Sequence, residues 1–262
     1  MNFAERYGPW ALVAGASEGL GAAFADECAK RGTNVVLVAR RRQLLEETAA
    51  RIRAEHHVET RVLTADLGRA DIGELVASVT DDIEVGLLIY NAAAAPTGPF
   101  VDVPLDEHIV NIAVNVTTPT VLSHMLAKKM VPRGRGGIVL VSSGAALGGM
   151  KVFVSYAAAK AYELILGEGL WDELRDHGVD ALGYVVGATA TPHFIASSKL
   201  DAVTATGART PQQVAERLFE VLGTGPRGHS HPEDEGRAAA NAALPRAEVV
   251  AATGRLTSSL WP

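Results

Sequence analysis

Short apolar runs recur along the chain and alternate with longer segments of helical length. Most of the runs are rich in β-branched residues and are bounded by Gly, Asp, Asn or Ser, which is the pattern of a buried strand. They cover Trp10 to Ala14, Asn34 to Ala39, Arg61 to Thr64, Val85 to Ile89, Gly137 to Val141 and Ala181 to Val186. Strands that alternate with helices predict βαβ units and therefore a parallel sheet.

The segments between these runs have the length of helices. They are Gly21 to Arg31, Arg42 to Glu55, Ile72 to Thr80, Leu105 to Met130 and Ser155 to Asp176. The predicted fold class is α/β, with one doubly wound parallel sheet and helices on both of its faces. We find no internal repeat, so residues 1–262 are expected to form a single domain.

Composition and charge exclude several classes of function. The chain has 262 residues, 48% of them hydrophobic, and a net charge of -6. An acidic chain lacks the basic surface that nucleic-acid binding requires. The single cysteine, Cys28, fits a reducing compartment. Without a signal-peptide pattern or a long apolar stretch, we expect a cytoplasmic protein with no membrane span.

A glycine-rich loop follows the first predicted strand and leads into the first predicted helix. It reads Ala14-Gly15-Ala16-Ser17-Glu18-Gly19-Leu20-Gly21. Its glycines allow a tight turn and a close approach to phosphate, and the N–H groups at the helix start favour an anion. After the first strand of a βαβ array, this loop predicts a dinucleotide site rather than only a tight turn.

The end of the second predicted strand indicates which dinucleotide is bound. An acidic residue at this point would accept hydrogen bonds from the ribose hydroxyls of NAD. The chain instead carries Arg40 and Arg41, which suit the 2′-phosphate of NADP. Glu18, in the glycine-rich loop, argues in the other direction. The predicted cofactor is NADP, with NAD as the alternative.

Tyr156 and Lys160 form a Tyr-x-x-x-Lys pair in an Ala-rich segment predicted as helix. Residues four apart lie on one helical face, about 5–6 Å apart at Cβ. A phenol is a poor acid or base at neutral pH, but a neighbouring ammonium group stabilises its ionised form. The pair is a candidate for proton transfer, although a core tyrosine and a solvated lysine would share the spacing.

A serine at the end of the fifth predicted strand adds to this pair. Ser143 stands thirteen residues before Tyr156. In open α/β sheets ligands bind at the carboxyl ends of the strands, so Ser143 is placed where its hydroxyl can meet a substrate. Ser142 is the competing hydroxyl, but adjacent strand residues face opposite ways.

With these motifs, the chain from about Trp10 to Thr191 resembles the short-chain dehydrogenase/reductase family, which implies a Rossmann-like fold. The resemblance implies the catalytic set Asn115, Ser143, Tyr156 and Lys160. The cofactor-binding positions that it implies are Gly15, Ser17, Gly19, Leu20, Gly21, Arg40, Arg41, Asp66, Leu67, Asn91, Ala92, Tyr156, Lys160, Gly187, Thr189 and Thr191. The motifs depart from the family pattern at Ala14, Tyr90, Ala93 and Val186, where Thr, Asn, Gly and Pro are usual.

The resemblance also implies a mechanism, in which a hydride passes between the nicotinamide and a carbonyl or secondary alcohol substrate. Tyr156 would exchange the proton with the substrate oxygen, and Ser143 would orient that oxygen. Lys160 would contact the ribose and act on Tyr156, while Asn115 would help to hold a water that connects Lys160 to solvent. A homodimer or homotetramer is implied as well.

Two rivals use the same fold. One is a cofactor-binding regulator or scaffold that has lost turnover, for which the altered motif positions would be evidence. The other is an epimerase or dehydratase, which usually needs a larger substrate region than the residues after Thr191 provide. The complete Asn-Ser-Tyr-Lys set argues against the regulator.

The last third of the chain carries the substrate expectations. Residues 192–210 are predicted to form a substrate lid, whose apolar side chains favour a moderately hydrophobic substrate. Residues 223–262 form an atypical C-terminal segment, in which a final strand is hard to place. His229 and His231 stand near acidic residues there, but we expect no metal site because the implied chemistry needs none.

Overall fold

The computed structural model describes residues 2–198 and 207–261. Within them, seven parallel strands form one sheet in the order β3-β2-β1-β4-β5-β6-β7. Their bounds are β1 Trp10–Ala14, β2 Asn34–Ala39, β3 Thr60–Thr64, β4 Val85–Tyr90, β5 Gly136–Ser143, β6 Val179–Val186 and β7 Arg227–His229. The strand order reverses between β1 and β4, where an open α/β sheet forms its ligand crevice.

All six predicted strands are present, and the predicted fold class is confirmed. β7 is the strand that the sequence pattern did not place. It is three residues long and contains no apolar run, since its residues are Arg, Gly and His. It pairs with β6 from Gly183–Arg227 to Val185–His229. Its strand conformation therefore depends on this pairing more than on the strand propensity of its own residues.

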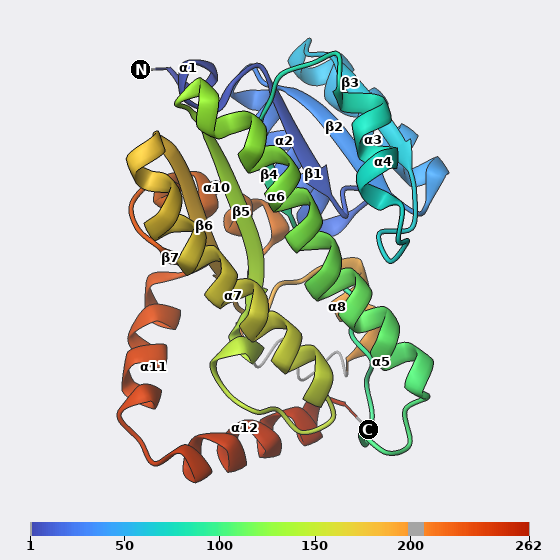
Figure 1. Cartoon of the computed structure of the whole chain (residues 1–262). Coiled ribbons are helices and arrows are strands. Elements are labelled where there is room, and N and C mark those ends of the chain that lie inside the picture. The colour runs from blue at the N-terminus through green and yellow to red at the C-terminus, as the bar shows by residue number, and fades with distance from the viewer. Residues whose placement is uncertain (1, 199–206, 262) are drawn as a thin grey trace.

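Helices cover both faces of the sheet (Figure 1). One face is covered by α2 (Gly19–Lys30), α3 (Arg42–His56) and α10 (Pro211–Val221), whose apolar residues share a core with the strands. The other face is covered by α4 (Ile72–Thr80), α6 (Thr118–Met130) and α7 (Val154–Leu174). Strands β1, β4 and β5 contribute to both cores because they are buried on both sides.

The predicted helix Leu105 to Met130 is a continuous helical run with a change in its middle. α5 (Leu105–Ile112) passes through a π-helical turn, η1 (Ala113–Thr117), into α6. Tyr90 at the end of β4 donates a hydrogen bond to the carbonyl oxygen of Val114 inside this turn. Turns of this kind often mark functional sites, and η1 contains Asn115.

The same run, Leu105–Arg133, is long and apolar enough by length and composition to cross a membrane. In the fold, 44% of its most apolar window is buried, and Leu122, Leu126 and Met130 belong to the core beneath α6. A core helix passes the same test, so the finding is weak evidence for a membrane. The predicted absence of a membrane partner stays a prediction.

Two glycines bring α7 close to the sheet. A Cβ atom at Gly167 would lie 2.7 Å from the backbone nitrogen of Gly183 in β6, closer than real Cβ atoms come. Only a residue without a side chain permits this approach. The packing fixes α7 against β5 and β6, with its N-terminal turns at the end where those strands finish.

The C-terminal segment folds back toward the carboxyl ends of the strands. After β7, α11 (Pro232–Ala242) leads away from the sheet, and α12 (Arg246–Leu260) crosses the end of the molecule where α7 begins (Figure 1). Arg246 donates to the carbonyl oxygen of Leu147 at 2.8 Å. Gly148 faces Val249, and Gly149 faces Val250. α12 is thereby fixed on the loop that precedes α7. The division into lid and C-terminal segment stays a prediction.

Candidate active site

Four predicted catalytic residues come from three neighbouring elements. Ser143 is the last residue of β5, Tyr156 and Lys160 lie in the first two turns of α7, and Asn115 lies in η1. The Lys160 ammonium nitrogen is 5.9 Å from the centroid of the Tyr156 ring. The structure therefore brings Tyr156 and Lys160 together, as their spacing predicts.

The two serines at the end of β5 face different surroundings. The Ser142 side chain is buried, and its hydroxyl donates to the carbonyl oxygen of Lys160 at 2.7 Å. Ser143 is half-buried, and its hydroxyl oxygen accepts from the backbone N–H of Ala145 at 3.2 Å. The Ser142 hydroxyl thus links α7 to β5. The Ser143 hydroxyl accepts in its hydrogen bond with Ala145, so its hydrogen can be donated to a substrate oxygen.

Lys160 has buried partners for its ammonium group. The side chain is 3% exposed and donates to the carbonyl oxygen of Val141 at 2.9 Å and to the carboxylate of Glu163 at 2.7 Å. Burial raises the pKa of Glu163 to about 7, and the positive charge of Lys160 limits the rise. Sequence reasoning did not identify Glu163. The available signal was an acidic residue three positions after Lys160, on the same helical face.

Asn115 uses its side chain to hold backbone. Its amide oxygen accepts from the N–H of Ala94 at 2.9 Å, and its amide nitrogen donates to the carbonyl of Ala94 at 2.7 Å and to Asn111 at 2.6 Å. This pair of bonds fixes the segment after β4 against η1. The expected part of Asn115 in a water-linked proton path stays a prediction.

The glycine-rich loop forms a cradle that side chains would fill. Gly15 has φ +83°, and a Cβ atom there would lie 2.8 Å from the backbone of Ala92. A Cβ atom at Gly21 would lie 2.0 Å from the carbonyl oxygen of Gly15. Both glycines are therefore required by the close packing of the loop, β4 and α2.

The start of α2 leaves backbone donors for a pyrophosphate. Glu18 occupies the N-cap position but makes no capping hydrogen bond with its side chain. The N–H groups of the first helical turn, at Gly19, Leu20 and Gly21, are then available to an anion. Thr191 lies close by, since its side chain would be 3.3 Å from a Cβ atom at Gly19.

The two arginines after β2 stand beside the glycine-rich loop. Arg41 donates to the Ser17 hydroxyl at 3.0 Å and forms an ion pair with Glu18 at 2.7 Å. Arg40 is exposed next to it. Glu18 therefore acts on the same guanidinium that would bind a 2′-phosphate, holding it in place and offsetting part of its charge.

The segments after β3 and β4 carry residues that the sequence predicts to contact the cofactor. The exposed Asp66 accepts from the N–H of Gly68 at 2.9 Å, and Leu67 beside it is buried. Asn91 donates to the carbonyl of Gly15 at 3.3 Å, while Ala92 packs against Gly15. Asn91 and Ala92 thus border the cradle, while the cofactor contacts of Asp66 and Leu67 stay a prediction. Tyr90, which departs from the family pattern, instead binds the carbonyl of Val114 in η1.

The loop after β6 reaches the other end of the cradle. Gly187 donates its N–H to the Ser230 hydroxyl at 2.9 Å, and Thr189 donates to the carbonyl of Gly187 at 3.1 Å. Thr191 caps α8 (Pro192–Ser197) by accepting from the N–H of Phe194 at 3.1 Å. Ser230 comes from the end of β7, which explains why sequence reasoning did not connect it with this loop.

Aromatic side chains gather next to Tyr156. The Phe153 ring lies 6.0 Å from the Tyr156 ring and 4.9 Å from the Trp261 ring, which lies 5.8 Å from Phe194. Trp261 follows α12, and Phe194 belongs to α8 within the predicted lid. Of that lid, residues 199–206 lie outside the described residues. The C-terminal segment thus supplies one wall of an apolar region beside the tyrosine.

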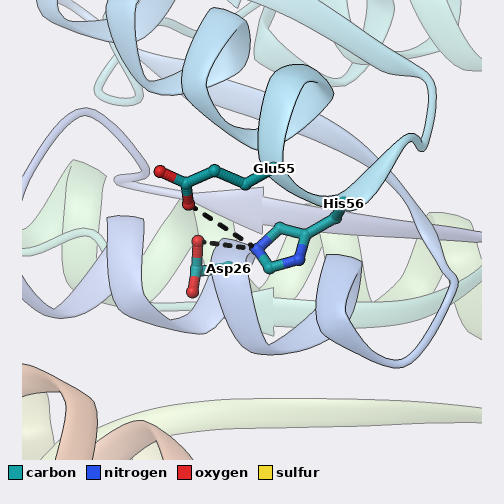
Figure 2. Close-up of side chains that lie close together, drawn as sticks. All are labelled: Asp26, Glu55 and His56. Atoms are coloured by element: carbon teal, nitrogen blue, oxygen red, sulfur yellow. Dashed lines mark hydrogen bonds and ion pairs between the residues drawn. The ribbon is translucent and has the colours of Figure 1, made fainter.

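A separate cluster of potential metal ligands lies between α2 and α3, where Asp26, Glu55 and His56 converge (Figure 2). Arg51 already binds it, with its guanidinium 2.5 Å from Asp26 and 2.8 Å from Glu55. Although burial opposes ionisation, hydrogen bonds from Arg51 and His56 lower the pKa of Asp26. The cluster is a network of ion pairs that joins two helices, and the expectation of no metal site stays a prediction.

Comparison with known proteins identifies the family. A family model described as short chain dehydrogenase matches residues 9–201. The chain belongs to the short-chain dehydrogenase family. The 7beta-hydroxysteroid dehydrogenase of Clostridium sardiniense is 35% identical over 223 residues, which cover 85% of this chain and 85% of that protein.

Solved structures extend the family match to the whole fold. A structure from work on 7beta-hydroxysteroid dehydrogenase stereoselectivity superposes with a TM-score of 0.91 at 30% identity, covering 97% of this chain and 99% of that chain. A short-chain dehydrogenase from Sphingobium yanoikuyae in complex with NADPH has a TM-score of 0.76 at 28% identity, covering 91% and 97%.

These findings confirm the predicted family, fold and type of reaction. The protein is an oxidoreductase that transfers a hydride between a nicotinamide cofactor and a carbonyl or alcohol group of a small molecule. The rival of a catalytically silent regulator is set aside. The glycine cradle, the start of α2 without a side-chain cap and Arg41 beside the loop fit an NADP cofactor, as the sequence predicts.

Proposed function

We propose that the protein is an NADP(H)-dependent hydroxysteroid dehydrogenase that acts on a 7β-hydroxyl group or the corresponding ketone. The observation that carries the proposal is the aromatic wall of Phe153, Phe194 and Trp261 beside Tyr156. Aromatic rings bury large apolar areas, which suits a flat, rigid hydrocarbon skeleton. The relatives named 7beta-hydroxysteroid dehydrogenase support the same substrate class.

The C-terminal segment links that wall to the relatives. The family model ends at residue 201, whereas the hydroxysteroid dehydrogenase structure is similar over 97% of this chain. The similarity therefore includes α11 and α12, which lie beyond the common family fold. Because α12 places Trp261 against Phe153 and Phe194, it is the element through which this segment would select the substrate.

The roles of the site residues follow from their chemistry. The Tyr156 hydroxyl would donate a proton to the substrate oxygen during reduction and remove it during oxidation. Ser143 would donate a hydrogen bond to the same oxygen, and the Lys160 ammonium would stabilise the Tyr156 phenolate. A bound nicotinamide supplies or accepts the hydride. Arg41, with Arg40 beside it, would bind the 2′-phosphate of the cofactor.

The decisive experiment follows the absorbance of reduced nicotinamide with the purified protein, NADP+ and three alcohols. We expect turnover with a 7β-hydroxysteroid, much slower turnover with its 7α epimer, and weak turnover with a small secondary alcohol. Efficient turnover of the small alcohol alone would leave the hydride chemistry intact but refute the steroid proposal. Tyr156→Phe should lose activity by about 10²-fold or more while still binding NADP+.

A Trp261 variant tests the aromatic wall directly. Trp261→Ala should raise KM for the steroid, with little change for a small ketone, because only the large substrate would reach the wall. Phe3→Ala is the matched control, since this aromatic residue packs against Tyr7 and Phe219 instead. Equal effects of Trp261→Ala on both substrates would show that the residue serves stability rather than selectivity.

The expected homo-oligomer has a surface that fits it. α5 and α7 are in contact and carry apolar side chains that are between 46% and 72% exposed, namely Leu105, Ile109, Val110, Ile112, Val154 and Ile165. A second copy of the chain would cover such a patch. Ile165→Glu should shift the protein to monomer in sedimentation, whereas Leu244→Glu, at an exposed leucine elsewhere, should not. A cytoplasmic location stays a prediction.

A further inference from the structure

Glu163 is a fully buried carboxylate beside the active site, with no part in the reaction described above. It is 0% exposed and lies 2.7 Å from the ammonium group of Lys160, which is itself 3% exposed. A buried ion pair gains stability only if the remaining polar atoms also have partners. Here the second carboxylate oxygen, Oε1, has no hydrogen-bond partner among the described residues. Burial of this carboxylate is therefore costly, which points to a functional reason for its presence.

The position of Glu163 on α7 relates it to the reacting tyrosine. Glu163 follows Lys160 by three residues and Tyr156 by seven, so the three side chains lie along one face of the helix. The Lys160 ammonium stands between the other two, 5.9 Å from the Tyr156 ring centroid. Any change in the charge of Glu163 reaches Tyr156 through this lysine and across about 10 Å of helix.

The groups around the carboxylate leave Lys160 as its main charged partner. Among the described residues, Tyr90 of β4 also interacts electrostatically with it, and burial together with the charge of Glu163 raises the pKa of Tyr90. β5 presents the carbonyl of Val141, which binds the same ammonium. His108 of α5 is occupied with Ser155 and the carbonyl of Phe100.

We propose that Glu163 is a positioning residue that fixes the Lys160 ammonium against β5 and sets how strongly its charge stabilises the Tyr156 phenolate. This inference rests on the proposed roles of Tyr156 and Lys160. An ionised Glu163 offsets part of the lysine charge, so the phenolate receives less stabilisation. A neutral side chain of the same shape would leave the lysine charge undiminished, and the phenolate would form at lower pH.

The test compares Glu163→Gln with wild-type enzyme in the direction of alcohol oxidation, where Tyr156 must be ionised to accept the proton. We expect the acid limb of the pH profile of kcat to move to lower pH by about 0.5–1 unit, as expected for one charge some 10 Å away. Glu163→Asp keeps the charge, so its limb should stay with the wild type. A shift of both variants by the same amount would point to packing and overturn the proposal.

A second measurement does not depend on turnover. The ultraviolet absorbance of phenolate is titrated in the protein without cofactor, and the curve of Tyr156→Phe is subtracted to isolate Tyr156. The isolated curve of Glu163→Gln should move in the same direction as the kinetic limb. Glu27→Gln is the matched control, because Glu27 is also buried and paired with cations, Lys30 and Arg31, but lies on α2. Its curve should not move.

The outcomes distinguish a failure of the Glu163 role from a failure of the proposed role of Tyr156. If Tyr156→Phe keeps near-normal turnover, the assignment of the proton donor fails. If Tyr156→Phe is inactive while Glu163→Gln leaves both the kinetic limb and the phenolate curve unmoved, the assignment stands and the role of Glu163 is refuted. Circular dichroism checks the fold of each variant, and Glu163→Met, which also removes the charge at a similar side-chain length, provides the same comparison if Glu163→Gln is unstable.

Discussion

Arg41 offers the sharpest test of cofactor choice, because the structure shows both what positions it and what opposes it. Its guanidinium lies 3.0 Å from the Ser17 hydroxyl and 2.7 Å from the Glu18 carboxylate. The side chain is 52% exposed and that of Glu18 is 31% exposed, so solvent screens both charges. We consider two substitutions. Arg41→Ala removes the positive charge, and Glu18→Gln removes the negative charge that opposes it.

The expected magnitudes follow from that partial exposure. A hydrogen bond to a charged group is worth about 1.5–3 kcal/mol, and solvent screening at a half-exposed side chain favours the lower end. Arg41→Ala should therefore lower kcat/KM for NADP by about tenfold. Glu18→Gln removes a negative charge near the bound 2′-phosphate and should raise kcat/KM for NADP by about two- to fivefold.

The assay measures kcat/KM with NADP and NAD separately, using one substrate at a fixed salt concentration. NAD lacks the 2′-phosphate, so its kcat/KM should change by less than about twofold in both variants. Arg53→Ala is the matched control, since Arg53 lies near the far end of α3, the helix that Arg41 precedes, and is bound to Thr60. Arg40→Ala, measured in parallel, shows how the phosphate contact is divided between the two arginines.

One pattern of results would refute the reasoning. Arg41 precedes α3 and binds Ser17 in the glycine-rich loop, so its loss could loosen the loop for any dinucleotide. Equal losses of kcat/KM with NADP and NAD would then show that Arg41 stabilises the glycine-rich loop and does not bind the 2′-phosphate. A Glu18→Gln variant with a lower kcat/KM for NADP would independently contradict the proposed phosphate contact.

Three further predictions concern the cradle and the stability of the fold. Gly15→Ala, at φ +83°, should abolish binding of NADP+ in calorimetry; normal affinity would contradict the packed cradle. Asp180→Asn should lower the free energy of unfolding in urea by about 1–3 kcal/mol, because Asp180 accepts from Tyr7 and Arg6; an unchanged midpoint would argue against this network. Because burial raises the pKa of Glu163 to about 7, the folded chain retains a proton that the unfolded chain loses near pH 4.5. As the pH rises from about 4.5 to about 7, the free energy of unfolding of the wild type should therefore fall by up to about 3 kcal/mol relative to that of Glu163→Gln. Parallel curves of stability against pH for the two proteins would exclude the raised pKa.

The fold could be predicted from the sequence wherever a strand is buried on both faces. β1 and β2 have the bounds that their apolar runs predict, since a run of buried β-branched residues begins and ends with the strand. β7 could not be found in this way. Its Arg227, Gly228 and His229 acquire strand geometry by pairing with β6, and such pairing depends on the folded neighbours rather than on local pattern.

The site divides along a similar line. Tyr156 and Lys160 were predictable because their proximity follows from helix spacing alone. The partners of Lys160 were less so, since the carbonyl of Val141 meets the ammonium only when α7 packs on β5. The places of Ser230 and Trp261 at the site were not predicted for the same reason. Both reach the site from elements far along the chain, after β7 and α12 have folded back.

Tyr90 and Glu163 are both buried behind the reacting groups and interact electrostatically. Tyr90 stands where the family pattern has Asn, and its hydroxyl binds the carbonyl of Val114 in the π-helical turn that contains Asn115. The charge of Glu163 also acts on Tyr90, while its carboxylate binds Lys160. A substitution of Tyr90 therefore acts on the reacting groups through η1, and a substitution of Glu163 acts on them through α7. Since electrostatically coupled residues do not contribute additively, Tyr90→Phe combined with Glu163→Gln should shift the pH profile by an amount different from the sum of the single shifts.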